Sequence, residues 1–178
     1  MIMVSEEQRR ALLAIAREAV NAAAGAPVTL LEISGDFPAA TGAFVTIKRG
    51  GRLRGCIGTL QCQLPLAEEI RRVAGSAARE DPRFPPLTRA ELDDLEVEVS
   101  VLGPLERIDP ADPGAIEIGR HGLVAEQGHR RGLLLPQVAS EWGWDREAFL
   151  AHTCAKAGLP SDAWRKGAAI YRFLAEVF

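Results

Sequence analysis

Hydrophobic residues in the first segment of the chain recur every three or four positions, as on one face of a helix. The members of this stripe are Leu12, Ile15, Ala16, Ala19, Val20 and Ala23. Ser5 and Gln8 lie three residues apart ahead of the stripe, which is typical of a capping box at a helix start. The pattern ends in Ala24–Pro27, so we expect a helix over about residues 5–23.

The sequence predicts four strand regions, mainly from the alternation of apolar and polar residues. Residues 42–60 are expected to form a β-hairpin with its turn at Arg49-Gly50-Gly51. Residues 95–101 alternate between valine or leucine and polar residues, which predicts a strand with one buried and one polar face. A second hairpin is expected over 122–135 with its turn at 128–131, and residues 169–178 look extended.

Further helices are expected between these strands. One begins at about Pro65, in the first helical position, and ends before the proline-rich segment 81–86. Thr88 and Glu91 form a second capping box, residues 138–142 suit a short helix, and Asp145 caps a helix that Gly158 ends. Hairpin-linked strands mixed with helices predict an α+β fold with antiparallel pairing. The loops at 81–87 and 109–114 are the candidate subdomain boundaries.

Composition narrows the classes of protein to consider. The chain has 178 residues, of which 47% are hydrophobic and 25% charged, as in an ordinary globular domain or two small subdomains. The net charge of −3 disfavours nucleic acid as a partner. No apolar run reaches the ~20 residues that a membrane helix needs, and the acidic start does not suit a secretory signal. Three cysteines without such a signal predict reduced thiols and a cytoplasmic location.

One local motif is far more distinctive than the composition. Residues 53–58 read Leu-Arg-Gly-Cys-Ile-Gly, directly after the strand pattern of 42–48. Further blocks follow in order at 81–87, 98–102, 121–123, 134–139 and 153–159. With these blocks, residues 5–178 resemble the AMMECR family, named for the AMME chromosomal-region candidate protein, whose bacterial and archaeal members are called AmmeMemoRadiSam system protein A. The Leu-Arg-Gly-Cys-Ile-Gly hexapeptide is the hallmark of that family.

The resemblance implies a single AMMECR-type domain over 5–178, built from two unequal subdomains. Each subdomain is expected to hold an antiparallel sheet flanked by helices, and the larger to contain both chain ends. The hexapeptide side chains would line a cleft between the subdomains that is not strongly basic. The family is associated with Memo-like proteins and radical-SAM proteins as partners. Its biochemical activity is not established, and a fold does not imply a function.

Cys56 is the first candidate for chemistry. On a regular strand, Arg52, Arg54, Cys56 and Gly58 would share one face, and the two guanidiniums would favour the thiolate. Gly55 and Gly58 weaken a strand, which indicates a bulge or a close approach by a ligand or another backbone. Cys56 would then be a reactive thiol, with Arg54 binding an anionic group. The alternative is a small, buried sheet residue.

His121 is the second catalytic candidate, because a thiol and an imidazole are the minimum for nucleophilic catalysis. The alternative is a hydrogen-bonded loop histidine. Asp81 and Arg83 would either present a carboxylate and a guanidinium to the cleft or pair with each other. Cys154 lies on an apolar helix face that favours core packing, although its family block keeps a cleft role open. The binding candidates are Arg54, Gly55, Gly58, Thr59, Asp81, Arg83 and Cys154.

Other residues are expected to be structural. Cys62 is interpreted as an incidental thiol, Glu98 as part of a solvated strand face, and the three tryptophans as core or interface anchors. No cysteine or histidine pair has metal-ligand spacing, and no motif for a nucleotide, a dinucleotide or an iron–sulfur cluster is present, so no metal or cofactor is expected. Two functions stay open. The chain is an enzyme or enzyme component acting on a small anionic or carbonyl ligand, or it is a non-catalytic module that binds a peptide or protein.

Overall fold

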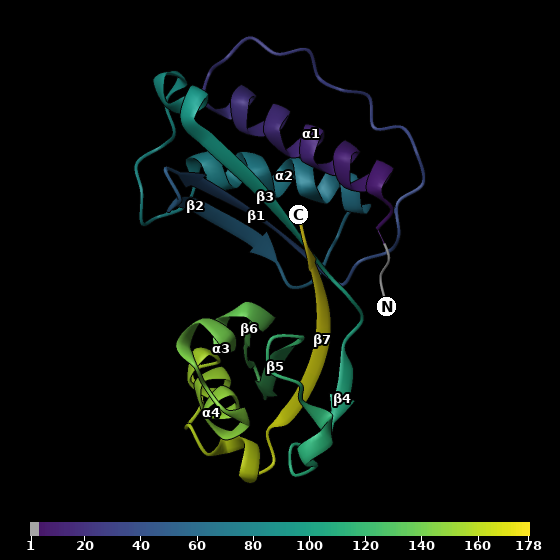
Figure 1. Cartoon of the computed structure of the whole chain (residues 1–178), viewed down its shortest axis with the longest axis vertical. Coiled ribbons are helices and arrows are strands. Elements are labelled where there is room, and N and C mark those ends of the chain that lie inside the picture. The colour runs from purple at the N-terminus through teal and green to yellow at the C-terminus, as the bar shows by residue number, and fades with distance from the viewer. Residues whose placement is uncertain (1–3) are drawn as a thin grey trace. The chain divides into compact units, whose positions relative to one another are not determined.

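The computed structural model describes residues 4–178 and confirms the α+β class. The chain folds into two compact units (Figure 1). The larger comprises residues up to Leu102 together with Glu176–Phe178, and the smaller comprises Gly103–Ala175. The chain therefore changes unit at the end of one strand and near the end of another. Neither the 81–87 loop nor the 109–114 loop is a boundary, because each lies wholly inside one unit.

The larger unit has three antiparallel strands in the order β2-β1-β3 and two helices. Its elements are α1 (Glu6–Ala23), β1 (Gly42–Arg49), β2 (Arg52–Thr59), α2 (Leu66–Arg79), the 3-10 helix η1 (Arg89–Asp94) and β3 (Leu95–Leu102). Both capping boxes are confirmed, at Ser5 and at Thr88. Figure 1 shows α1 and α2 side by side on one face of the sheet. The sheet's other face therefore carries the side chains that do not belong to this core.

The buried face of the sheet is apolar, as the alternation predicts. Ala43, Val45 and Ile47 of β1 are fully buried and pack with α1 and α2 in one cluster. Gly55 belongs to this face: a Cβ there would lie 2.3 Å from the carbonyl oxygen of Ala77 in α2. Gly55 thus permits the backbone of α2 to approach the strand closely. Such a close approach is one of the two features that a glycine within a strand can indicate.

The first hairpin also contains a β-bulge, the other feature that glycines in a strand can indicate. Its two turn residues, Gly50 and Gly51, have φ values of 54° and 73°, the left-handed region that two-residue hairpin turns require. The register then shifts between Ile47 and Lys48, so that Lys48 pairs with Leu53 and Ile47 with Gly55. Arg54 is the extra residue of a β-bulge. A bulge reverses the alternation of faces before and after it, which matters for the arginines of the hexapeptide.

The smaller unit has four strands, with β4 and β5 on either side of β7 and β6 outside β5. Its elements are β4 (Glu106–Ile108), the 3-10 helix η2 (Pro113–Ala115), β5 (His121–Gln127), β6 (Arg130–Leu134), α3 (Pro136–Trp142), α4 (Arg146–Lys156), the 3-10 helix η3 (Ala163–Arg165) and β7 (Ala169–Val177). The strands pair antiparallel throughout. Leu123, Phe149, Leu150 and Ile170 are among the residues of its separate core.

Four local predictions are wrong in detail. Pro65 is the N-cap of α2 rather than its first helical residue. Ser100, assigned to the polar face of β3, is buried. The second hairpin turns on two residues, so Arg130 begins β6. Trp142 is 71% exposed and is no core anchor, because it ends the short α3 and stacks on Trp144 at the surface. The burial of Ser100 and the exposure of Trp142 depend on packing between elements, which periodicity does not encode.

Candidate functional site

Cys56 lies on the face of the sheet that points away from α1 and α2. It pairs with Thr46 of β1, and Thr46 pairs on its other side with Glu98 of β3. Cross-strand partners point to the same face, with Cβ atoms about 4.5–5.5 Å apart, so the three side chains form one row across three strands. The Cys56 Sγ and Thr46 Oγ1 atoms are 3.3 Å apart. Cys56 is a free cysteine and is half-buried.

At the other end of the row, the charge of Glu98 is compensated by Lys48. Lys48 Nζ donates to Glu98 Oε2 at 3.1 Å, with both side chains about one-third exposed. Lys48 lies two residues from Thr46 on the same strand and therefore on the same face. Glu98 is thus not simply solvated, as its position on a polar strand face suggested. We define Cys56, Thr46, Glu98 and Lys48 as the thiol row.

Asp81 fixes the backbone beneath Cys56. Its carboxylate is buried, and one oxygen accepts the backbone N–H of Cys56 at 2.9 Å. Arg83 donates to the same carboxylate from its backbone N–H, its Nε at 3.0 Å and its Nη2 at 2.7 Å. These hydrogen bonds from Arg83, more than its charge, hold the pKa of Asp81 far below its ordinary value, against the opposing effect of burial. Asp81 and Arg83 therefore pair with each other, the second alternative from the sequence.

Arg54 does not lie beside the thiol as a spare cation. Its Nε and Nη2 donate to Glu91 of η1 at 2.8 and 3.2 Å, and its Nη1 donates to the Pro85 carbonyl at 3.0 Å. The hydrogen bond from Arg54 is the largest effect that lowers the pKa of Glu91, to about 2. The anionic group that Arg54 binds is thus one of the protein's own carboxylates.

The bulge also removes Arg52 from the face of Cys56. Arg52 pairs with Arg49, which lies an odd number of residues from Thr46 and so points to the opposite face. The prediction that both arginines stand beside the thiol and favour its thiolate is therefore wrong. The physical reason is the single extra residue in β2, which a strict two-residue period cannot show.

The other candidates from the hexapeptide region have structural partners. A Cβ on Gly58 would lie 2.2 Å from the ring of Phe44, so this glycine makes room for an aromatic side chain on its cross-strand neighbour. The Thr59 hydroxyl donates to the Gln61 carbonyl at 2.8 Å and accepts the Gln61 N–H, which closes the turn after β2. Gly58 shares the face of the thiol row, whereas Thr59 ends the strand.

His121 belongs to the smaller unit, at the first position of β5. Its Nδ1 accepts the backbone N–H of Glu117 at 2.9 Å, so the neutral ring carries its proton on Nε2. Burial, then the charges of Arg172 and Arg120, lower the pKa of His121. The neutral imidazole therefore presents a hydrogen-bond donor at Nε2. With Glu106, Arg120 and Arg172 it lines a cavity of about 290 Å³.

The pKa values of Cys62 and Cys154 are raised. Burial, followed by the charge of Glu69, raises the pKa of Cys62 to about 11. Cys154 is fully buried in the core of the smaller unit, where burial raises its pKa. Core packing is thus the correct alternative for Cys154. Cys56 differs from both in its place, on the sheet face that the helices leave uncovered.

Sequence reasoning missed Thr46 and Lys48 as members of the site. A two-residue turn at Gly50-Gly51, followed by an unbulged strand, would pair Thr46 with Gly55 rather than with Cys56. The bulge supplies the missing step in register. In the sequence, Gly55 was the feature that could have indicated this bulge, since glycines within strands often mark bulges.

Comparison with known proteins places the chain in a family. The family model described as AMMECR1 matches residues 13–178. The chain belongs to the AMMECR1 family. The resemblance carried by the hexapeptide and its neighbouring blocks is thereby confirmed.

Relatives of this AMMECR1 chain cover nearly its whole length. A protein of Methanothermobacter thermautotrophicus is 46% identical and covers 98% of this chain and 95% of its own. Protein MJ0810 of Methanocaldococcus jannaschii is 47% identical over 89% of this chain and 82% of its own. The crystal structure of the uncharacterized protein PH0010 from Pyrococcus horikoshii has a TM-score of 0.85 at 43% identity, covering 98% of this chain and 92% of that one. These names support the fold and the family and assign no activity.

Two other classes of site can be assessed in the AMMECR1 chain. Among residues 4–178, no three or more His, Cys, Asp or Glu side chains gather in an arrangement that could hold a metal ion. None of the helices in this described part has the length and apolar character needed to cross a membrane. In the larger unit, the Cys56 thiol lies beside the Thr46 hydroxyl, and its backbone N–H is bound by the buried carboxylate of Asp81.

Proposed function

We propose that this AMMECR1-family chain is an enzyme, or a component of one, whose reactive group is the Cys56 thiol. The observation that carries the proposal is the place of Cys56 in the thiol row, with its Sγ 3.3 Å from the Thr46 hydroxyl. A hydroxyl at this distance can donate to a thiolate and stabilise it. Stabilisation of the thiolate by this hydroxyl requires no cation beside the sulfur. Arg54 and Arg83 are accordingly free to pair with carboxylates.

Rigid support for the thiol is part of the same proposal. A reactive group must be held by neighbours whose own positions are fixed. Cys56 meets this requirement through its backbone, because its N–H is bound to a carboxylate that hydrogen bonds from Arg83 hold in place. Asp81 and Arg83 are therefore positioning residues for Cys56, and Arg54 has the same role through the segment that contains Pro85.

His121 lies in the smaller unit, so the proposal for the Cys56 thiol assigns it no role.

Thiol alkylation tests the proposal directly. In the native protein at pH 8, we expect iodoacetamide to modify Cys56 at least 10-fold faster than Cys62. A pKa of about 11 leaves only about one Cys62 thiol in a thousand ionised at that pH. Thr46→Val removes the hydroxyl with little change in volume and should slow Cys56 alkylation about 3-fold to 10-fold, whereas Thr46→Ser should not. Peptide mass spectrometry assigns each modified cysteine.

The outcomes separate the two functions. Alkylation of Cys56 no faster than that of Cys62 would refute the reactive thiol and leave a binding module. Memo-like and radical-SAM proteins, suggested as partners by family association, are then the ligands to test. A Cys56→Ser variant that keeps both the co-purification and the cellular phenotype would support binding without chemistry. Loss of the phenotype with the co-purification intact would support the enzyme.

A further inference from the structure

A cavity of about 290 Å³ lies wholly within the smaller unit. It is lined by residues 172–174 of β7 together with Pro104, Glu106, Arg120 and His121. Its volume is close to the lower end of the range usual for small-molecule sites, about 300–1,000 Å³, so it suits a small ligand. We propose that this cavity binds a small monocarboxylate, whose charged group contacts Arg120 and His121.

The strand register brings polar groups of the cavity onto one face of the sheet. His121 of β5 pairs with Leu174 of β7. Arg172 of β7 pairs with Leu123 on one side and with Glu106 of β4 on the other. Cross-strand partners point to the same face, as do residues two positions apart, so His121, Arg172 and Glu106 share this face. The same face continues into the core of the smaller unit at Leu123.

The turn before β5 holds the His121 imidazole in place. The backbone N–H of Glu117 donates to Nδ1 of His121 at 2.9 Å. The Glu117 carbonyl accepts the backbone N–H groups of Arg120 at 3.2 Å and of His121 at 3.0 Å. Because Nδ1 is occupied, Nε2 is the ring atom left for a ligand, and in the neutral ring it carries the proton. A donor held in this way suits an oxygen acceptor.

Arg120 is the cation that a ligand can recruit. Its Nη1 donates to the Glu117 carboxylate at 3.1 Å, and both side chains are 61% exposed. Such exposed pairs contribute little free energy, so a ligand carboxylate can replace Glu117 as the partner of Arg120. Arg172 differs, because it donates to both oxygens of Glu106 at 2.9 Å and to the Ala115 carbonyl at 2.8 Å. Arg172 is therefore a positioning residue that fixes one wall.

The lining of the cavity defines the class of ligand. Arg120 and Arg172 outnumber Glu106, so the lining has one net positive charge when the imidazole is neutral. This charge matches a carboxylate better than a doubly charged phosphate, which Glu106 would repel more strongly. Pro104 and Leu174 offer apolar contacts to the rest of the ligand. The cavity therefore favours a monocarboxylate with a small apolar body.

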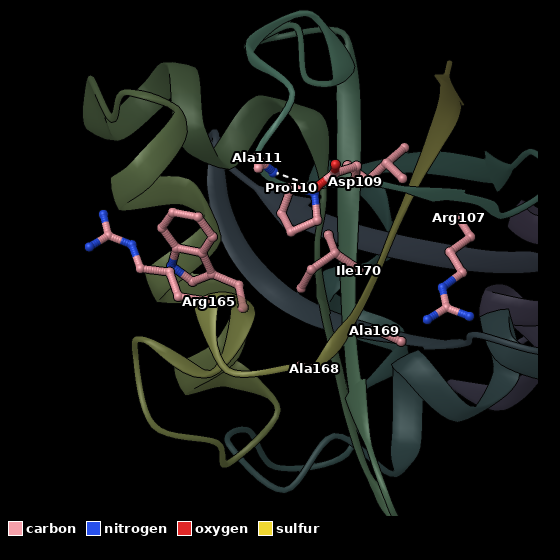
Figure 2. Close-up of a pocket in the computed structure, with 11 residues that line it drawn as sticks. Arg107, Asp109, Pro110, Ala111, Arg165, Ala168, Ala169 and Ile170 are labelled. Atoms are coloured by element: carbon pink, nitrogen blue, oxygen red, sulfur yellow. Dashed lines mark hydrogen bonds between the residues drawn. The ribbon is translucent and has the colours of Figure 1, made fainter.

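A larger cavity of the same unit, of about 530 Å³, does not combine charged and apolar groups in this way (Figure 2). Arg107 pairs with Tyr171, so it points to the face opposite Ile170. Ile170 is also only 1% exposed. One ligand therefore cannot meet the cation and the apolar wall of that cavity together, whereas His121 and Leu174 are direct cross-strand partners in the smaller one.

Binding of a carboxylate should change the pKa of His121. In the free protein, burial and then the charges of Arg172 and Arg120 lower this pKa, while Glu117 and Glu106 oppose the shift. An anion beside Nε2 favours the imidazolium, so the bound ligand should raise the pKa of His121. By linkage, the ligand should bind more tightly as the pH falls through that pKa. This coupling provides a readout that is specific to an anion at His121.

Nuclear magnetic resonance tests the cavity without an activity assay. The full chain, labelled with ¹⁵N, is titrated with isovalerate, benzoate, benzamide and inorganic phosphate. The chain has three histidines, so the ring signals of His121 are assigned by their loss in His121→Gln. We expect isovalerate, benzoate or both to shift these signals saturably and to raise the pKa of His121, and benzamide and phosphate to bind at least 10-fold more weakly. Isovalerate alone would identify an aliphatic body, and benzoate alone an aromatic one.

Matched variants complete the test. Arg120→Gln should weaken the binding of the responding carboxylate at least 10-fold, which is about 1.4 kcal/mol. Arg165→Gln is the control, because Arg165 has a similarly exposed pair with Glu147 and does not line the cavity. Glu117→Gln should instead tighten binding about 2-fold to 5-fold, since it frees Arg120 and keeps the backbone N–H that holds His121.

Three results would each overturn the proposal. The first is that neither carboxylate shifts the His121 signals at millimolar concentration. The second is that benzamide or phosphate binds as tightly as the carboxylates. The third is that the Arg120 and Arg165 variants bind alike.

Discussion

Replacement of Asp81 by asparagine is the sharpest single test of the architecture beneath Cys56. The Asp81 side chain is 3% exposed and accepts from the backbone of Cys56 and from Arg83. Asparagine has almost the same shape, so the substitution leaves no cavity. It replaces one acceptor oxygen by an NH2 group, which then faces a donor.

The expected loss of stability follows from these contacts. Removing one partner of a buried ion pair costs about 3–5 kcal/mol. Arg83 is 55% exposed, so water can solvate its guanidinium once the pair is broken, and losing the pair itself costs less than this range, about 1–2 kcal/mol. A buried N–H left without an acceptor, here that of Cys56, adds about 1–3 kcal/mol to any such loss. We therefore expect Asp81→Asn to lower the free energy of unfolding by about 3 kcal/mol at pH 7.

The pH dependence of the unfolding free energy provides an independent check on the direction of the Asp81 contribution. The pKa of Asp81 is lowered in the folded protein from an ordinary value of 3.8. Its stabilisation is therefore complete above the unfolded pKa and is lost as the pH falls toward the folded one. The difference in unfolding free energy between wild type and Asp81→Asn should be constant from pH 7 to pH 5. It should shrink by about 1 kcal/mol between pH 5 and pH 3.

Urea unfolding, followed by far-ultraviolet circular dichroism at each pH, measures this difference. Arg83→Gln is the companion variant, since it removes the charged guanidinium donors and keeps both backbone donors of the carboxylate. It should cost less than Asp81→Asn. A loss below 1 kcal/mol for Asp81→Asn, or a difference that stays constant down to pH 3, would refute the reasoning.

Further predictions concern the packing of the larger unit. Gly55→Ala should destabilise it by at least about 2 kcal/mol in urea unfolding, because its Cβ would lie 2.3 Å from the rigid backbone oxygen of Ala77. Gly75→Ala, in the same helix as Ala77 and with open space around its Cβ, should instead stabilise by about 0.5–1 kcal/mol; a similar effect of both substitutions would contradict this view. Glu91→Gln should cost about 2 kcal/mol, because it weakens the pair with Arg54. The pKa of Glu91 is lowered to about 2, so its stabilisation should decline below about pH 4.5, and a wild-type-minus-variant difference that does not decline would count against the pair.

Local patterns predicted most of the secondary structure. The capping residues Ser5 and Thr88 are correct because a side-chain oxygen three residues before a suitable partner satisfies free N–H groups locally. The turn at Gly50-Gly51 is correct because only glycine readily adopts two successive left-handed conformations. Such features depend on neighbours within a few residues, and the sequence displays those neighbours directly.

The candidate site shows the opposite case. The sequence identified Cys56, Asp81 and Arg83 as residues to examine, and the tertiary structure brings them together over 25 residues of chain. In the tertiary structure, however, Arg54 pairs with Glu91, and Thr46 lies beside the Cys56 thiol. One bulge decides both, since a single extra residue changes which side chains share a face.

The sequence by itself determined the α+β class, the family and the presence of one distinctive hexapeptide around Cys56. Only the tertiary structure decided which charges are already paired, which glycines make room for a neighbour and where the units divide. The physical reason is that hydrophobic periodicity acts within one element, whereas ion pairs, close backbone approach and strand register join elements that are distant in the chain.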